Sequence, residues 1–136
     1  SILRREMCIA APIIGVDGDP EMLRIAKEHF KIGRLKDLEL VRSDALEYVT
    51  HNETSHDLVL VDLCHELDLI PGVDEPAFIA ELRKCTSAKG KLCFNTIAHD
   101  GPSELRSQRV AELLRHQFDN VSVHHYQGIN RVVAAW

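Results

Sequence analysis

Three aspartates follow short apolar runs, at the places where an open parallel sheet binds its ligands. Asp17 and Asp62 come directly after runs that end at positions 16 and 61, and Asp44 comes three residues after a run that ends at position 41. The carboxyl ends of parallel strands meet at one edge of a sheet, where loops converge and helix N-termini offer free amides. We therefore expect the three carboxylates to line a binding cleft.

The first two aspartates have the chemistry to hold a nucleoside. A carboxylate just after the second strand of a nucleotide-binding unit has two oxygens that suit a vicinal diol, so Asp17 is expected to accept both ribose hydroxyls. The alternative, a loop acid that only caps the next helix, is weakened because Asp19 can fill that role. Asp44 is expected to accept an adenine amino proton while the Ala45 amide bonds a ring nitrogen. An N-cap for a helix at 45–50 is an equally compatible role for Asp44.

Asp62 leaves the most apolar run of the chain and is expected at the inner wall of the cleft, near the group that is transferred. There it would orient an attacking amine or take its proton. A role limited to capping the following loop is an equal alternative. His65 and Glu66 add titratable groups nearby, but no motif surrounds them, and a solvated loop is the favoured interpretation.

No metal site is predicted. The four cysteines, at positions 8, 64, 85 and 93, have neither the paired spacing of a zinc site nor the density of a secreted disulfide framework. His124 and His125 are adjacent in a β pattern, so their side chains are expected on opposite faces of a strand. Among the cysteines, Cys64 is the one expected to line the cleft, because it lies close to Asp62.

The composition indicates one domain over residues 1–136. The chain has 45% hydrophobic residues, enough to form a core, and 16 Lys plus Arg against 21 Asp plus Glu. The basic residues are scattered, which argues against nucleic acid as a partner. No apolar run approaches the roughly 20 residues that cross a bilayer, and no signal-peptide pattern is present. We therefore expect a cytoplasmic protein with no membrane partner.

Strand and helix patterns alternate along the chain. Strands are predicted at 13–16, 38–41, 58–61 and 91–96. Helical segments are predicted as a helix tail at 2–10, helices at 21–30 and 45–50, a helix bearing Phe78, Leu82 and Cys85, and a helix capped by Ser103 that reaches Phe118. A loop is expected at 64–76 and a turn at Lys89 and Gly90. The continuous Leu-Val-Leu-Val run at 58–61 is typical of a central parallel strand covered on both faces.

The end of the chain has a different pattern. Runs at 121–126 and 131–135 are joined by four residues, too few for a helical crossover, so the two strands must pair antiparallel. The patterns together predict an α/β, Rossmann-like fold. It has a mostly parallel sheet with helices on both faces and a C-terminal antiparallel hairpin.

Four short motifs resemble those of one enzyme family. They are Ile-Ile-Gly-Val-Asp-Gly-Asp-Pro at 13–20, Ser-Asp-Ala at 43–45, Asp-Leu-Val-Leu-Val-Asp at 57–62 and Lys-Gly-Lys-Leu at 89–92. Together they resemble the spermidine-synthase-like branch of the class I S-adenosylmethionine-dependent methyltransferases, over nearly the whole chain. In that family the first acid binds ribose, the Asp-Ala pair binds adenine, and the acid after the fourth strand faces the transferred group.

The resemblance implies S-adenosylmethionine as the cofactor and small-molecule partner. The implied cofactor-binding residues are Asp17, Gly18, Asp44, Ala45, Asp62 and Leu63, with Asp62 also the catalytic residue. It implies methyl transfer to an amine of a protein substrate, as in the eukaryotic methyltransferases that modify a lysine or the N-terminus of a translation elongation factor. A homodimer is a further expectation.

Two departures from the family pattern leave other functions open. The family places a strand and a Gly-rich loop before its first helix, and Ser1 falls about where that loop ends. The first strand is thus expected to be missing, and the chain by itself is expected to bind the cofactor weakly. Spermidine synthases tend to carry an Asp-x-x-Asp pattern after the fourth strand. Here the pattern begins with Asp62, but His65 stands in place of the second aspartate, which favours methyl transfer over aminopropyl transfer. A fragment or pseudoenzyme that binds a partner is the third interpretation.

Overall fold

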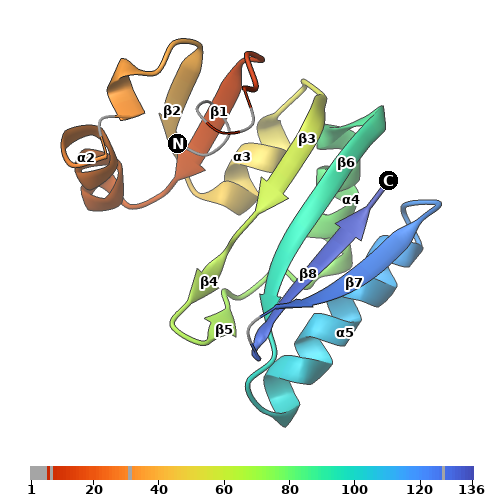
Figure 1. Ribbon diagram of the computed structural model, residues 1–136. Helices are drawn as coiled ribbons and strands as arrows, with labels where there is room; N and C mark the ends of the chain where they lie inside the picture. The colour runs from red at the N-terminus through yellow and green to blue at the C-terminus, as the bar shows by residue number, and fades with distance from the viewer. Residues whose placement is uncertain (1–5, 7, 31, 127) are drawn as a thin grey trace. The chain divides into compact units, whose positions relative to one another are not determined.

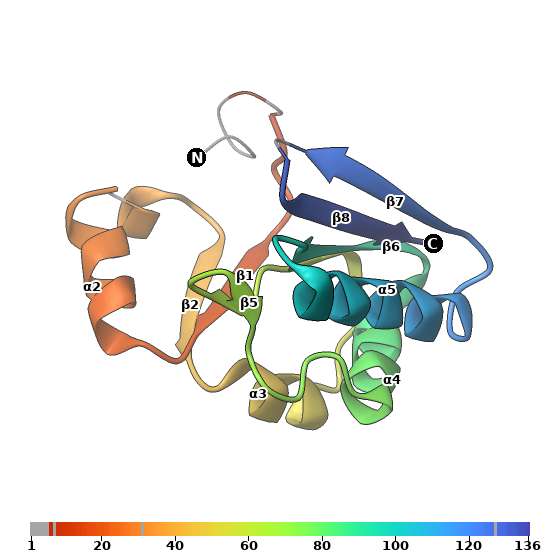
Figure 2. The ribbon, with the colours of Figure 1, turned by 90° about the horizontal axis from the view of Figure 1, so that it is seen from below.

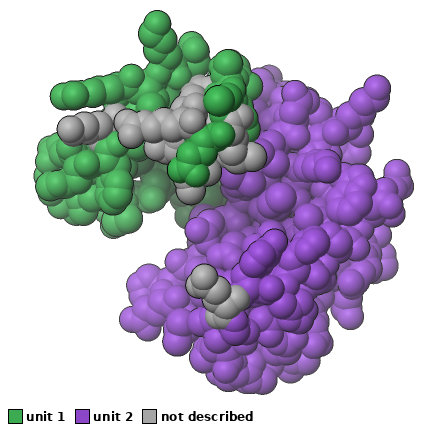
Figure 3. Space-filling model, viewed as in Figure 1, with its two compact units in different colours: residues 1–48 green, residues 49–136 purple. Residues whose placement is uncertain are grey.

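The computed structural model describes residues 6, 8–30, 32–126 and 128–136. The chain divides into two compact units, residues 1–48 and residues 49–136 (Figure 3). The helix tail predicted at 2–10 falls largely outside the described residues, and positions 8–10 have no regular secondary structure.

Unit 1 contains two parallel strands with helical segments between them (Figure 1). Its elements are β1 (Ile13–Asp17), α2 (Pro20–Glu28), η1 (Ile32–Arg34) and β2 (Leu38–Arg42). As the sequence predicts, Asp19 is the N-cap of α2, and its carboxylate accepts a hydrogen bond from the Glu21 amide at 2.8 Å. No described residue of unit 1 is fully buried, and Phe30 is 73% exposed. The described residues of unit 1 therefore form no fully buried core.

Helix α3 (Ala45–His51) follows, and the division between the units falls within it. Unit 2 then contains β3 (His56–Val61), β4 (Cys64–His65), β5 (Asp68–Leu69), α4 (Pro76–Cys85), β6 (Thr86–Ile97), α5 (Gly101–Arg115), β7 (Val121–Tyr126) and β8 (Asn130–Ala135). Its main sheet has the order β3-β6-β8-β7, in which β3 and β6 are parallel and the C-terminal hairpin is antiparallel. The predicted α/β fold class, with its antiparallel C-terminal hairpin, is confirmed.

The core of unit 2 lies between this sheet and two helices. Helices α4 and α5 cover the same face of the sheet, below β6 and β8 in Figure 2. The side chains that fill this layer are fully buried and include Ile79, Leu82, Leu92, Phe94, Val110, Leu114 and Val133. Alternation along β6 sends Leu92 and Phe94 into the core and leaves Cys93 and Asn95 on the other face, half-buried.

The expectation that β3 is covered on both faces is wrong for the described residues. Val61 is buried at 6% exposure, but Leu58 and Leu60 are 43% and 58% exposed. Side chains alternate along a strand, so Val61 packs toward the helices while the two leucines point to the opposite face. An apolar run alone does not specify what covers each of its faces.

The second half of the chain differs from prediction at three local points. The predicted loop at 64–76 contains the small β4-β5 hairpin. Strand β6 begins at Thr86 rather than after a turn at Gly90, because the ladder with β3 passes from the pair His56 and Thr86 to the pair Leu58 and Lys91. Four residues of β6, at 87–90, thus lie opposite the single residue Asp57 of β3, and Gly90 lies in this bulge.

Helix α5 begins one turn earlier than predicted, and its N-cap is Asp100 rather than Ser103. Ser103 is the third helical residue and completes a capping box. The helix also ends at Arg115, before Phe118.

Candidate functional site

Unit 1 brings two of the predicted acids together. Asp17 ends β1, and the Ser43 amide after β2 donates a hydrogen bond to the Asp17 carbonyl at 3.2 Å. Gly18 lies against the same loop, since a Cβ at that position would be 3.6 Å from the Ser43 carbonyl oxygen and 3.9 Å from Asp44 Cα. The parallel register, with Asp17 opposite Arg42, thus places the Asp17-Gly18 turn beside the Asp44 loop.

Each of these two acids also has a local structural role. Asp17 Oδ1 accepts a hydrogen bond from the Asp19 amide at 2.8 Å, which fixes the turn out of β1. Asp44 Oδ1 accepts from the Leu46 and Glu47 amides at 2.8 and 3.0 Å, as an N-cap of α3. Both hydrogen-bonding patterns hold the carboxylates in defined positions.

The residues of this turn fit a nucleoside. Asp17 is half-buried and Asp44 exposed, and the hydrogen bonds that the described residues donate to these two side chains all go to Oδ1. The Oδ2 atom of each acid is thus available to a ribose hydroxyl or an adenine amino group. Gly18 adds no side chain between the two acids, and Ala45 begins α3 with its amide at the helix N-terminus.

Asp62 lies in unit 2, directly after β3, and a residue that the sequence did not indicate holds its carboxylate. Asn95 Nδ2 on β6 donates to Asp62 Oδ1 at 2.8 Å. The ladder pairs Val61 with Phe94, so the next residue of each strand projects on the same face of the sheet. Asp62 is exposed, and Asn95 therefore orients it while leaving the second oxygen accessible.

The loop after Asp62 forms a hydrogen-bonded hairpin and is more than a solvated loop. The Ile70 amide donates to the Leu63 carbonyl at 3.1 Å and closes the base of the β4-β5 hairpin. His65 and Glu66 are exposed at the far end of this hairpin, and Glu66 has a left-handed φ of 54°. The structure thus gives Leu63 a hairpin-closing contact and places the titratable pair away from that contact.

Cys64 lies in the same hairpin and is half-buried. Burial raises the pKa of its thiol to about 11, and the nearby carboxylates of Asp62 and Asp68 act in the same direction. The thiol is therefore protonated at neutral pH, which argues against a nucleophilic role.

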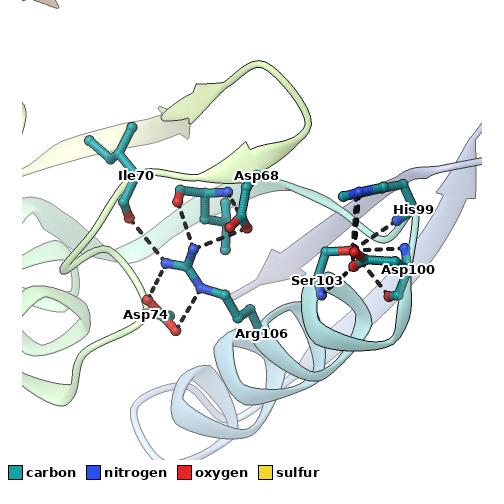
Figure 4. Close-up of polar contacts among 8 residues, drawn as sticks. Asp68, Ile70, Asp74, His99, Asp100, Ser103 and Arg106 are labelled. Atoms are coloured by element: carbon teal, nitrogen blue, oxygen red, sulfur yellow. Dashed lines mark hydrogen bonds and ion pairs between the residues drawn. The ribbon is translucent and has the colours of Figure 1, made fainter.

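Arg106 on α5 binds β5 of this hairpin and the loop that follows it (Figure 4). Its guanidinium donates to both carboxylate oxygens of Asp74, at 2.6 and 3.1 Å, and to Asp68 Oδ1 at 3.0 Å. It also donates to the carbonyl oxygens of Leu69 and Ile70 at 2.7 and 3.1 Å. The hydrogen bond from Arg106 holds the pKa of the Asp74 carboxyl below its ordinary value.

A second polar cluster, on the right of Figure 4, is a helix cap. Ser103 Oγ lies 2.6 Å from Asp100 Oδ1 and 3.2 Å from His99 Nδ1, a combination of residue types found in hydrolytic triads. Ser103 is buried, however, and its hydroxyl also accepts from the His99 and Asp100 amides at 3.0 Å. These contacts start α5 and leave the hydroxyl no access to a substrate.

The described residues contain no helix long and apolar enough to span a membrane. They also contain no cluster of three or more His, Cys, Asp or Glu side chains that could hold a metal ion. The alternation predicted for the histidine pair agrees with their surroundings, because His124 lies beside Ser122 and Tyr126 while His125 lines a cavity against α5.

The fold of the chain is a Rossmann-like α/β fold. The chain belongs to the methyltransferase domain family, whose model matches residues 2–94. S-adenosylmethionine is the cofactor of this family. No curated protein has a significantly similar sequence.

Solved structures with the same fold include methyltransferases and spermidine synthases. Human methyltransferase-like protein 13, in complex with SAH, is 16% identical with a TM-score of 0.75 over 92% of this chain and 70% of its own. A probable spermidine synthase from Corynebacterium glutamicum is 17% identical with a TM-score of 0.75 over 90% of this chain. Spermidine synthase from Thermotoga maritima is 13% identical with a TM-score of 0.71 over 92% of this chain. The chain spans 46% and 52% of the lengths of these two synthases.

Proposed function

We propose that the protein transfers a methyl group from S-adenosylmethionine to an amine, with a lysine or the N-terminus of a protein as the acceptor. One observation supports the proposal most. The Asp17-Gly18 turn lies against the Ser43-Asp44 loop at the carboxyl ends of two parallel strands, where nucleotides bind in open α/β sheets. In this arrangement the Asp17 carboxylate accepts ribose hydroxyls, and Asp44 with the Ala45 amide binds the adenine edge.

The remaining candidate residues would act on the acceptor. Bound S-adenosylmethionine supplies an electrophilic methyl group on a sulfonium. Asp62, held by Asn95, would accept a hydrogen bond or a proton from the incoming amine. Alignment of the two reactants supplies most of the rate enhancement, because methyl transfer requires an in-line approach.

Aminopropyl transfer is the second candidate, since two spermidine synthases have the same fold. His65 stands where those enzymes tend to carry an acid, and its side chain is exposed on β4. A neutral or positive imidazole gives a cationic polyamine no charge partner, so methyl transfer is preferred.

The test measures cofactor binding by Asp17→Asn in the full-length protein. The amide keeps an oxygen for the Asp19 N–H but loses the charge that strengthens bonds to ribose hydroxyls. Losing a hydrogen bond to a charged acceptor costs about 1.5 kcal/mol or more, so calorimetry should show about ten-fold weaker S-adenosylmethionine binding. The matched control, Asp19→Ala, removes the α2 cap and should lower stability while cofactor affinity stays within about two-fold.

Unchanged affinity in Asp17→Asn would remove the ribose role from this residue. Acceptor class is tested with isotopically labelled S-adenosylmethionine and poly-L-lysine. Transfer that occurs only from the decarboxylated cofactor to a polyamine would replace the proposal with aminopropyl transfer. Cofactor binding without transfer to any amine would favour a non-catalytic protein.

A further inference from the structure

Arg106 uses every hydrogen-bond donor of its guanidinium on one short segment. Nε and one hydrogen of Nη2 go to the two oxygens of Asp74. The other Nη2 hydrogen goes to the Ile70 carbonyl, and the two Nη1 hydrogens go to Asp68 Oδ1 and the Leu69 carbonyl. A guanidinium carries five N–H groups in a rigid plane, so no donor is left for solvent or substrate.

The bonded segment is directly connected to Asp62. Ile70, whose carbonyl accepts from Arg106, donates its own amide to the Leu63 carbonyl at 3.1 Å. Leu63 is joined to Asp62 by a peptide bond. Between these two fixed points the chain runs out and back as the β4-β5 hairpin, with Cys64 paired to Leu69. The guanidinium thus fixes the backbone just after the acid, while Asn95 fixes its side chain.

We propose that Arg106 is a positioning residue for the transfer reaction: it holds the Cys64–Leu69 hairpin rigid so that Asp62 meets the acceptor in one orientation. This inference rests on the proposed function. A purely structural clamp would need only the half-buried Asp74 pair. The additional contacts reach Asp68 and Leu69 in the hairpin and Ile70 directly after it.

Arg109 provides a matched control one turn further along α5. It donates to the Asp74 carbonyl at 2.8 Å and to Glu75 at 3.1 Å, so it binds the end of the same loop but no residue of the hairpin. Arg109→Gln should therefore change loop contacts without releasing Asp62. A second variant, Asp68→Asn, weakens the Arg106 contact on the hairpin while the Asp74 pair stays intact. This variant still tests the inference if Arg106→Gln fails to fold.

Cys64 reports on the hairpin independently of activity. Labelling of Cys64 by N-ethylmaleimide is followed by mass spectrometry, with half-buried Cys93 as the internal reference. Releasing the hairpin relieves burial, the main cause of the raised pKa, so Arg106→Gln should label Cys64 about ten-fold faster or more. If the hairpin stays in place, loss of the nearby positive charge can only slow the labelling, because the Arg106 charge lowers the thiol pKa. The sign of the change thus distinguishes the two cases.

Kinetics in the full-length protein then test the role in the reaction, with labelled S-adenosylmethionine and poly-L-lysine. Arg106→Gln should reduce kcat about ten- to one hundred-fold with unchanged cofactor affinity, Asp68→Asn should show a smaller loss, and Arg109→Gln should match the wild type. Faster Cys64 labelling with unchanged kcat, or equal losses in Arg106→Gln and Arg109→Gln, would overturn the inference. If the wild type transfers no methyl group while Arg106→Gln still releases Cys64, the proposed function fails and Arg106 retains only a structural role.

Discussion

Asn95 Nδ2 lies 2.8 Å from Asp62 Oδ1, and this hydrogen bond joins adjacent parallel strands at their carboxyl ends. Parallel register makes the contact, because the pair Val61 and Phe94 is followed by two residues that project from the same face. A short-chain amide on a strand is a stiffer support for a carboxylate than a residue on a loop. The orientation of Asp62 is therefore a property of the sheet.

The first prediction concerns this hydrogen bond. Asn95→Ala should lower the rate of methyl transfer about ten-fold, because Asp62 loses a donor whose bond to a charged acceptor contributes about 1.5 kcal/mol or more. Cofactor affinity should be unchanged. Cys93→Ala is the control, two residues earlier on the same face of β6, and it should leave the rate near that of the wild type. Equal rates in Asn95→Ala and the wild type would show that Asp62 needs no support from β6.

The second prediction concerns the pH dependence of stability. Asp74 has a lowered pKa in the folded protein because Arg106 donates to its carboxylate. A depressed pKa contributes stability above the unfolded value of about 3.9, and that stability is lost as the pH falls through the folded value. Asp74→Asn should therefore lower the free energy of unfolding by about 1.5 to 3 kcal/mol at pH 7, and this difference should shrink below about pH 4.

Denaturant unfolding at pH 7 and pH 3 measures this difference. Glu75→Gln is the matched control, because its pair with Arg109 is exposed on both sides and should contribute less than about 1 kcal/mol. If Asp74→Asn is equally destabilising at both pH values, the ionised pair is not the source of the stability.

The third prediction compares two glycines. A Cβ on Gly90 would lie 2.8 Å from the His56 carbonyl oxygen and 2.9 Å from Ser87 Oγ, which is closer than nonbonded atoms pack. Gly90→Ala should therefore destabilise the protein by about 1 to 3 kcal/mol, because the bulge between β3 and β6 must open.

Gly101 is the opposite case, since a methyl group added to it in the first turn of α5 would have no atom within 4 Å beyond its chain neighbours and the helix backbone. Gly101→Ala should change stability by no more than about 1 kcal/mol, because the lower chain entropy of alanine is opposed by its contact with the ring of Pro102. The two variants are compared by urea unfolding. A Gly90→Ala protein as stable as the Gly101→Ala protein would mean that the bulge has room for a side chain.

Local patterns in the sequence predicted most of the helices and strands and the positions of Asp17, Asp44 and Asp62 at the ends of strands. The β-hairpin at the end of the chain was predictable because four connecting residues permit only antiparallel pairing. Asp19 was predictable as a cap, and Asp17 and Asp44 as neighbours, because these features depend on short segments and on the shared edge of a parallel pair. Their roles in binding the cofactor remain predictions.

Tertiary structure alone decided which distant residues support the acids. Asn95 is 33 positions from Asp62, and Arg106 is 38 positions from Asp68 and 32 from Asp74. No periodicity of a single element links such positions, since the contacts depend on strand register and on where α5 crosses the sheet. The start of β6 and the exposure of Leu60 were missed for the same reason. The sequence of a strand specifies which side chains share a face. Only packing against other elements decides which face is covered and which partner each polar group meets.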